Sequence, residues 1–261
     1  MAIHTSKNLS TFNAIARQSA IGVMALVATT ATLLTAESAS AQVTRQQYDQ
    51  QYENAPSDLL RLDFDAWTQF NDLVNDERNS LNTLNLPQAD LSKLRWSGGV
   101  QDVEVFFINE GAGYRNQLFY SVDSGTTKNK IFDDISSPLS ILSNSKGPLK
   151  LGEGASLGNF AGNTFIDFFV KSNGKNGGQQ FLGFDPNLNS DNLTHVLGYT
   201  VGDYLLLGFE DIVGGGDEDY NDVVFAVKGV TTSVPEPSLI LGLLGASSLM
   251  MIRKRHAQSE A

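Results

Sequence analysis

The pattern of short apolar runs beyond residue 98 constrains the fold more than any other feature of the chain. These runs alternate with clusters of Gly, Asn, Asp and Ser, which is typical of strands joined by turns. No helical pattern lies between them, so antiparallel pairing is expected. The pattern predicts a β-sandwich or jelly roll of roughly eight strands. We expect strands near residues 101–108, 114–122, 130–135, 163–171, 179–184, 193–200, 203–209 and 222–229, with glycine-rich turns at 111–113, 152–158, 173–178 and 214–216.

A helix is expected before this β-domain, which we place at residues 99–230. In residues 59–86 the apolar side chains fall largely at intervals of three and four, and Pro87 follows. The apolar positions are Leu60, Phe64, Trp67, Phe70, Val74, Leu81 and Leu84. The aromatic stripe of such an amphipathic helix would pack on the domain, although a partner-binding helix is an alternative. Residues 42–58 are interpreted as a polar leader, so 42–98 forms one segment of leader and helix.

An acidic segment between the last two expected strands carries the strongest chemical signal. Residues 208–227 read GFEDIVGGGDEDYNDVVFAV. Clustered carboxylates repel one another unless they are protonated, solvated or bridged by a cation, and Ca²⁺ accepts about six to eight oxygen ligands in flexible geometry. The segment therefore predicts a Ca²⁺ site, with Glu218 as a further oxygen-bearing neighbour. The candidate ligands are Glu210, Asp211, Asp217, Asp219, Asn221 and Asp222.

Two known loop types and one simpler alternative were compared with this segment. Asp217, Asp219 and Asn221 have the spacing of half an EF-hand loop, but Asp222 and Lys228 stand where that loop needs Gly and Glu. The Gly-Asp repeats of β-rolls require tandem copies, and here there is one. The alternative is a structural turn whose Asp and Asn side chains cap backbone amides, with Glu210 and Asp211 facing solvent.

The N-terminus predicts export. Lys7 and Arg17 lie in a polar stretch that precedes an apolar run at residues 20–36. Ala39 and Ala41 are then placed as small residues at a signal peptidase cleavage site. We therefore interpret residues 1–41 as a signal peptide, with a retained N-terminal anchor as the alternative.

The C-terminal segment 231–261 has three parts in order. Pro235, Glu236 and Pro237 belong to the motif at 234–237, an apolar run covers 238–252, and a basic tail of Arg253, Lys254 and Arg255 follows. A run of 15 residues is shorter than the roughly 20 that span a bilayer comfortably, and the basic tail favours a cytoplasmic end. The arrangement resembles the PEP-CTERM sorting signal. That resemblance implies a transmembrane sorting helix and cleavage by an exosortase, a membrane peptidase. A plain tail anchor is the alternative.

A second resemblance covers most of residues 100–229. The segments VEVFFINEGAGYRNQLFYSVD (103–123), ASLGNFAGNTFIDFFVKSNG (155–174), HVLGYTVGDYLLLGFED (195–211) and the acidic segment together resemble the domain-of-unknown-function family 4114. The resemblance implies an extracellular β-domain that binds Ca²⁺ and has no established activity. The tract 124–141 matches nothing in that family, so a ligand-binding role there is open.

Charge and composition exclude several classes of function. The chain has 29 Asp and Glu against 18 Lys and Arg, a formal charge of −11, and loss of 1–41 and 237–261 would remove two acidic and five basic residues and leave −14. This field repels nucleic acid and attracts cations. The absence of cysteine excludes disulfides, thiolate metal sites and a cysteine nucleophile.

We expect a binding or structural module rather than an enzyme. His195 lies in an apolar run and is interpreted as a packed residue, and GASLG at 154–158 matches a nucleophile elbow only formally because no helix follows Ser156. The predicted function is a structural, adhesion or glycan-binding module of the cell envelope or extracellular matrix, in which Tyr114 or Phe184 stacks on sugar rings. Partners would be polysaccharide or other envelope proteins. The alternative is a secreted hydrolase that acts on extracellular polysaccharide.

Overall fold

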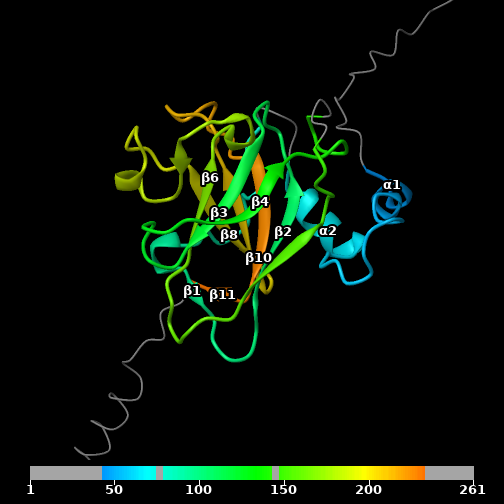
Figure 1. The fold of residues 1–261 in the computed structure, drawn as a ribbon, viewed down its shortest axis with the longest axis horizontal. Helices are drawn as coiled ribbons and strands as arrows, with labels where there is room; N and C mark the ends of the chain where they lie inside the picture. The colour runs from blue at the N-terminus through cyan, green and yellow to red at the C-terminus, as the bar shows by residue number, and fades with distance from the viewer. Residues whose placement is uncertain (1–42, 75–78, 143–146, 233–261) are drawn as a thin grey trace, which may run out of the picture. The chain divides into compact units, whose positions relative to one another are not determined.

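The computed structural model describes residues 43–74, 79–142 and 147–232 (Figure 1). The fold is mainly β, with antiparallel sheets and few helices, as the sequence predicted. Within the described ranges no helix combines the length and the apolar character needed to cross a bilayer. The predicted signal peptide at 1–41 and the sorting segment from Pro235 to Arg255 lie outside the described residues.

The larger sheet has five strands and carries the acidic segment. Its order is β5 (Gly154–Gly158), β2 (Val103–Asn109), β10 (Val223–Lys228), β9 (Tyr204–Phe209) and β8 (Val196–Val201), and every neighbouring pair is antiparallel. The central strands β9 and β10 read YLLLGF and VVFAVK, and all their residues are buried except Tyr204 and Lys228, which lie half-buried at one end. Nearly continuous apolar sequence is expected of strands that are covered on both faces.

The smaller sheet packs on one face of the larger one. Its order is β4 (Asn129–Ile135), β3 (Asn116–Ser121), β6 (Asp167–Lys171) and β7 (Phe181–Leu182). Phe132 of β4 stacks on Phe225 of β10 with 5.7 Å between ring centroids, and Figure 1 shows β3, β4 and β6 over the sheet that contains β8 and β10. A short pair, β1 (Arg95–Trp96) and β11 (Val230–Thr231), forms a third sheet.

The N-terminal segment, which was interpreted as a polar leader, packs on the core through its aromatic residues. Helix α1 (Arg45–Gln50) begins with a capping box at Thr44, and its Tyr48 is fully buried. The Tyr48 hydroxyl donates to the carbonyl of Leu62 at 2.8 Å, and that of Tyr52 donates to the carbonyl of Leu151 at 2.8 Å. Tyr48 and Tyr52, which stand among Gln, Asn and Asp, are the residues from which this packing could have been predicted.

The helix expected over residues 59–86 is corrected. Helix α2 covers only Phe64–Asn71 and lies beside β2, where the Trp67 indole donates to the carbonyl of Ile108 at 2.9 Å (Figure 1). Asp63 caps its first turn. Beyond residue 78 the backbone bonds to the β-domain instead, with Ala89 N donating to the Gly198 carbonyl. Leu84 is 93% exposed, so the apolar spacing there does not mark a packed helix face.

All eight predicted strands are found, but three others were missed. These are β1, β5 and β11. Residues 152–158 were predicted as a turn, whereas 154–158 form the edge strand β5. Glycine is required there because a Cβ on Gly154 would lie 2.7 Å from the Phe106 ring. The GASLG segment is therefore a strand, and the Ser156 hydroxyl donates to Asp102 Oδ2 at 2.8 Å.

Candidate cation site

The acidic loop joins β9 to β10, and its glycines fold it back over its own start. Gly214, Gly215 and Gly216 have φ values of 99°, 91° and 56°, which lie in the left-handed region where glycine has little steric cost. A Cβ on Gly216 would lie 2.3 Å from Glu210 Oε2. The glycine run therefore lets the backbone approach a buried carboxylate that a larger residue would displace.

Three of the predicted ligands come together in this loop. Glu210, Asp217 and Asp219 each offer one carboxylate oxygen, and these oxygens lie within 4.8 Å of one another. Glu210 and Asp219 are buried, with exposed fractions of 1% and 3%, while Asp217 is exposed. Two oxygens bound to one Ca²⁺ at about 2.3–2.6 Å lie no more than about 5 Å apart. The three carboxylates are thus spaced for a shared calcium ion that is accessible from the side of Asp217.

Glu210 is the most constrained of the three. Its Oε1 accepts a hydrogen bond from Tyr220 N at 2.7 Å, whereas its Oε2 is buried and has no hydrogen-bond partner among the described residues. Burial, together with the charges of Asp219 and Asp217, raises the pKa of Glu210 to about 7, although the hydrogen bond from Tyr220 N acts in the opposite direction. A cation next to Oε2 would stabilise the ionised form in place of the proton.

Asp211 and Asp222 form a separate pair beside this group. Asp222 Oδ2 accepts from Asp211 N at 2.9 Å, and Asp211 Oδ2 accepts from Asn116 Nδ2 at 2.6 Å. Burial raises the pKa of Asp211, and burial together with the Asp211 charge raises the pKa of Asp222 to about 8. Both residues line a cavity of about 640 Å³ that Asp217 and Tyr114 also line. Asp217 therefore belongs both to the three-carboxylate group and to this cavity.

Asn221 is held by contacts that linear sequence did not reveal. Its backbone N–H donates to Asp219 Oδ1 at 3.0 Å, and its Nδ2 donates to the Asn79 carbonyl at 3.1 Å. Leu81 N also donates to the Asp219 carbonyl at 3.3 Å. Segment 79–81 thus closes over the loop, and Asn116 supports it from β3. No local sequence motif marks these contacts, because Asn116 is 95 residues from its partner in the loop and Asn79 is 142 residues from its own.

His195 and Asp191 support the outer side of the loop. The fully buried His195 places Nδ1 3.2 Å from the Glu210 carbonyl oxygen and Nε2 2.9 Å from Asp191 Oδ2. Asp191 Oδ2 also accepts from Gly214 N at 2.6 Å. Both ring nitrogens of His195 are engaged within the fold, so the ring positions the loop through its backbone.

The structural-turn alternative accounts for only part of this geometry. Carboxylates of the loop do cap backbone amides, at Tyr220, Asn221 and Asp211. That alternative placed Glu210 and Asp211 toward solvent, whereas both are buried. Capping is the common role of Asp and Asn in turns, but it does not require three carboxylate oxygens within 4.8 Å of one another.

The fold and the loop define an antiparallel β-domain with a buried acidic loop. Residues 160–230 match the family model described as a domain of unknown function, DUF4114. The match extends from before β6 to β11 and includes the acidic loop, so the predicted family domain is confirmed for these residues. The resemblance expected at 103–123 and at residues 155–159 lies outside the match. Neither a curated protein nor a solved structure matches the chain.

Proposed function

We propose that the chain is an exported protein of the cell envelope or extracellular matrix. Its β-domain would bind Ca²⁺ and act as a structural, adhesion or glycan-binding module. The observation that carries the metal proposal is the group of Glu210, Asp217 and Asp219, which each offer one carboxylate oxygen within 4.8 Å of the others. The buried Oε2 of Glu210, which has no hydrogen-bond partner among the described residues, supports it.

The donor atoms favour Ca²⁺ over other common metals. All three carboxylates are hard oxygen ligands, and the chain has no cysteine. Mg²⁺ demands a near-ideal octahedron and keeps several waters, whereas Ca²⁺ tolerates irregular oxygen cages. Backbone carbonyls of the glycine loop and water would supply the remaining oxygens.

The two terminal segments support export and sorting. The apolar run before Ala39 and Ala41 fits signal peptidase, and Pro235, Glu236 and Pro237 before an apolar run and a basic tail fit an exosortase. This order would place the β-domain outside the cytoplasmic membrane, with transient or retained anchoring by 238–252. The two packed sheets support a β-sandwich or jelly-roll architecture for the exported part. The GASLG strand favours a module over a hydrolase with a nucleophile elbow.

Thermal unfolding of the full-length chain in Ca²⁺ and in chelator tests the metal proposal. A ligand that binds only the folded state at one hundred times its Kd stabilises it by about 2.7 kcal/mol. We expect the Tm to rise with Ca²⁺ and the rise to shrink in Asp217→Asn. The matched variant Asp58→Asn changes an exposed aspartate away from the loop and should keep the full rise. An equal Tm in millimolar Ca²⁺ and in chelator would refute calcium binding.

Mass spectrometry of the protein recovered from its host tests the sorting proposal independently. We expect an N-terminus after Ala41 and a C-terminus near Pro235 to Pro237. A recovered chain that still ends beyond Arg255 would exclude cleavage at the sorting motif, whatever the outcome of the calcium experiment.

A further inference from the structure

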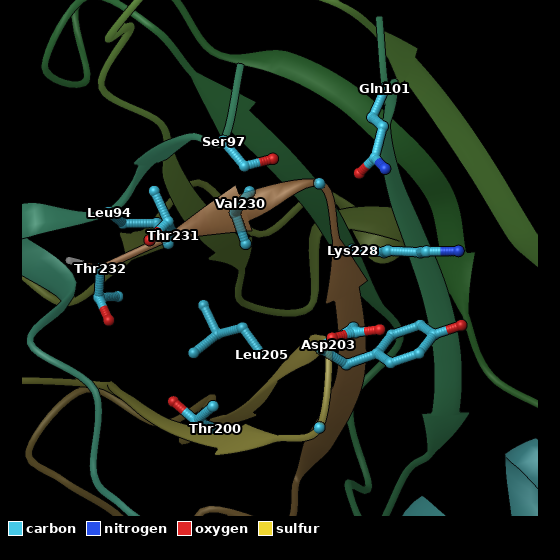
Figure 2. Close-up of a pocket in the computed structure, with 13 residues that line it drawn as sticks. Leu94, Ser97, Gln101, Thr200, Asp203, Leu205, Lys228, Val230, Thr231 and Thr232 are labelled. Carbon is cyan, nitrogen blue, oxygen red and sulfur yellow. The ribbon is translucent and has the colours of Figure 1, made fainter. Parts of the chain in front are cut away.

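A second cavity lies at the opposite end of β9 and β10 from the acidic loop. It has a volume of about 480 Å³ and lies between the β8–β9 hairpin and the β1–β11 pair (Figure 2). Tyr204 begins β9 and Lys228 ends β10, whereas the acidic loop joins the other ends of these strands. A strand of this length separates the two sites by roughly 17 Å at about 3.4 Å per residue. The cavity is therefore distinct from the candidate cation site.

Polar side chains with free hydrogen-bonding capacity surround this cavity. The side chains of Ser97, Gln101, Thr200, Asp203 and Thr232 line it, and none of them forms a hydrogen bond or ion pair with another residue in the described part of the chain. Figure 2 shows Ser97 and Gln101 on one side of the hollow and Thr200 on the other. Together these groups offer hydroxyl and amide groups that donate and accept hydrogen bonds, and the carboxylate of Asp203, which accepts them.

The interior of the cavity also has an apolar wall. Leu205 of β9 is 4% exposed, and Figure 2 shows it facing Val230 of β11 across the hollow. A volume of about 480 Å³ lies inside the range of about 300–1,000 Å³ that small-molecule sites occupy. Most of the lining side chains are polar, so the cavity suits a ligand that carries many hydrogen-bonding groups. The ligand would place C–H groups on the wall and hydroxyls at the rim.

Hydrogen bonds to backbone carbonyls hold the walls in place. Ser97 N donates to the Gly229 carbonyl at 3.0 Å, and the Trp96 indole donates to the Gln101 carbonyl at 2.9 Å. On the other side, Val201 pairs with Tyr204 around a two-residue hairpin loop, and Gly202 at its first position has φ of 58° as a type II′ turn requires. A preformed cavity avoids part of the ordering cost of binding.

The charge of the lining identifies the class of ligand. Asp203 and Lys228 contribute one negative and one positive charge, so the cavity is balanced in a chain with a net charge of −11. A polyanion would be repelled by the surrounding protein, and a polycation would find a single carboxylate here. We infer that this cavity binds an uncharged oligosaccharide, whose hydroxyls match the free polar rim and whose ring faces match Leu205 and Val230. This inference rests on the proposed binding role of the domain but not on calcium.

Titration with neutral tetrasaccharides tests the inference. The full-length chain would be titrated in chelator with glucose-, mannose- and galactose-based tetrasaccharides by calorimetry. We expect at least one to bind, with a Kd that rises at least about tenfold in Gln101→Ala and in Asp203→Asn. Asp58→Asn is the control that changes an exposed aspartate outside the cavity, and its Kd should stay within about twofold.

Four outcomes would overturn the inference. The first is that no member of the panel binds at about 10 mM, and the second is an unchanged Kd in both cavity variants. The third is binding that appears only with Ca²⁺, which would place the sugar at the acidic loop. The fourth is that a uronic acid tetrasaccharide, titrated in the same way, binds more tightly than any neutral one, which would contradict the charge argument. Failure of the calcium proposal is distinguishable from these outcomes. In that case the tetrasaccharide still binds in chelator, but Ca²⁺ does not change the Tm.

Discussion

The two ends of the strands β9 and β10 carry groups of different charge and burial, although both ends belong to the same pair of buried strands. At one end the loop collects buried carboxylates, and burial and mutual repulsion raise the pKa of Glu210 and Asp222. At the other end the polar groups are mostly exposed, and the charges of Asp203 and Lys228 balance. The strands between them are apolar and buried. The strands therefore fix where the two candidate sites lie, while the loops determine the chemical groups that each one presents.

The largest expected effect on stability comes from a cavity in the buried strands that join the two ends. Leu207 in β9 is 1% exposed, and Leu207→Ala should lower the free energy of unfolding by about 2–5 kcal/mol. Leu84→Ala is the matched control, because Leu84 is 93% exposed and its loss should cost less than about 0.5 kcal/mol. Urea unfolding measures both. Similar costs for the two variants would contradict the central position of β9.

A second prediction concerns a buried carboxylate outside the acidic loop. Burial raises the pKa of Asp167, in β6 of the smaller sheet, to about 7, against about 3.9 in an unfolded chain. The folded state therefore holds a proton that the unfolded state releases, and the contribution of this group to stability is full below about pH 4 and is lost as the pH rises through 7.

Asp167→Asn should remove this pH dependence. The variant keeps an acceptor for the Phe168 amide and should be more stable than the parent at pH 8 by on the order of 4 kcal/mol, with little difference near pH 4. Urea unfolding in chelator between pH 4 and 8 measures the difference. A parent and a variant with parallel pH profiles would show that Asp167 ionises normally in the fold.

The sequence predicted the strands on both sides of the acidic loop and six candidate ligands within it, of which the structure groups the carboxylates of three. It did so because Leu205 to Phe209 and Val223 to Val227 are apolar runs and the ligands lie close together between them. Asn116, Asn79 and the second cavity were not predictable in this way. They depend on which distant segments the sheets bring together, and Gly154 and Leu84 show the same limit, since packing there overrode the local pattern.

A smaller effect tests whether the N-terminal segment influences either end. Asp63 Oδ1 accepts from Ala66 N at 2.8 Å at the start of α2, and Asp63→Ala should cost about 1 kcal/mol. Asp58→Ala changes an exposed aspartate that caps no helix, so it should leave the free energy of unfolding almost unchanged. Thermal unfolding compares them. We expect Ca²⁺ and tetrasaccharide affinities to be unchanged in both, and a loss of either in Asp63→Ala would connect α2 to that site.

The central claim is that the buried Glu210 binds a calcium ion together with Asp217 and Asp219, and calorimetric titration of Ca²⁺ into the full-length chain tests it most directly. Glu210→Gln keeps the acceptor for Tyr220 N but removes the charge at Oε2, while Glu53→Gln makes the same change at an exposed position. The account predicts that Ca²⁺ binds the parent and Glu53→Gln equally and that its Kd rises at least about tenfold in Glu210→Gln. No binding to the parent at millimolar Ca²⁺, or equal affinity in all three proteins, would contradict it.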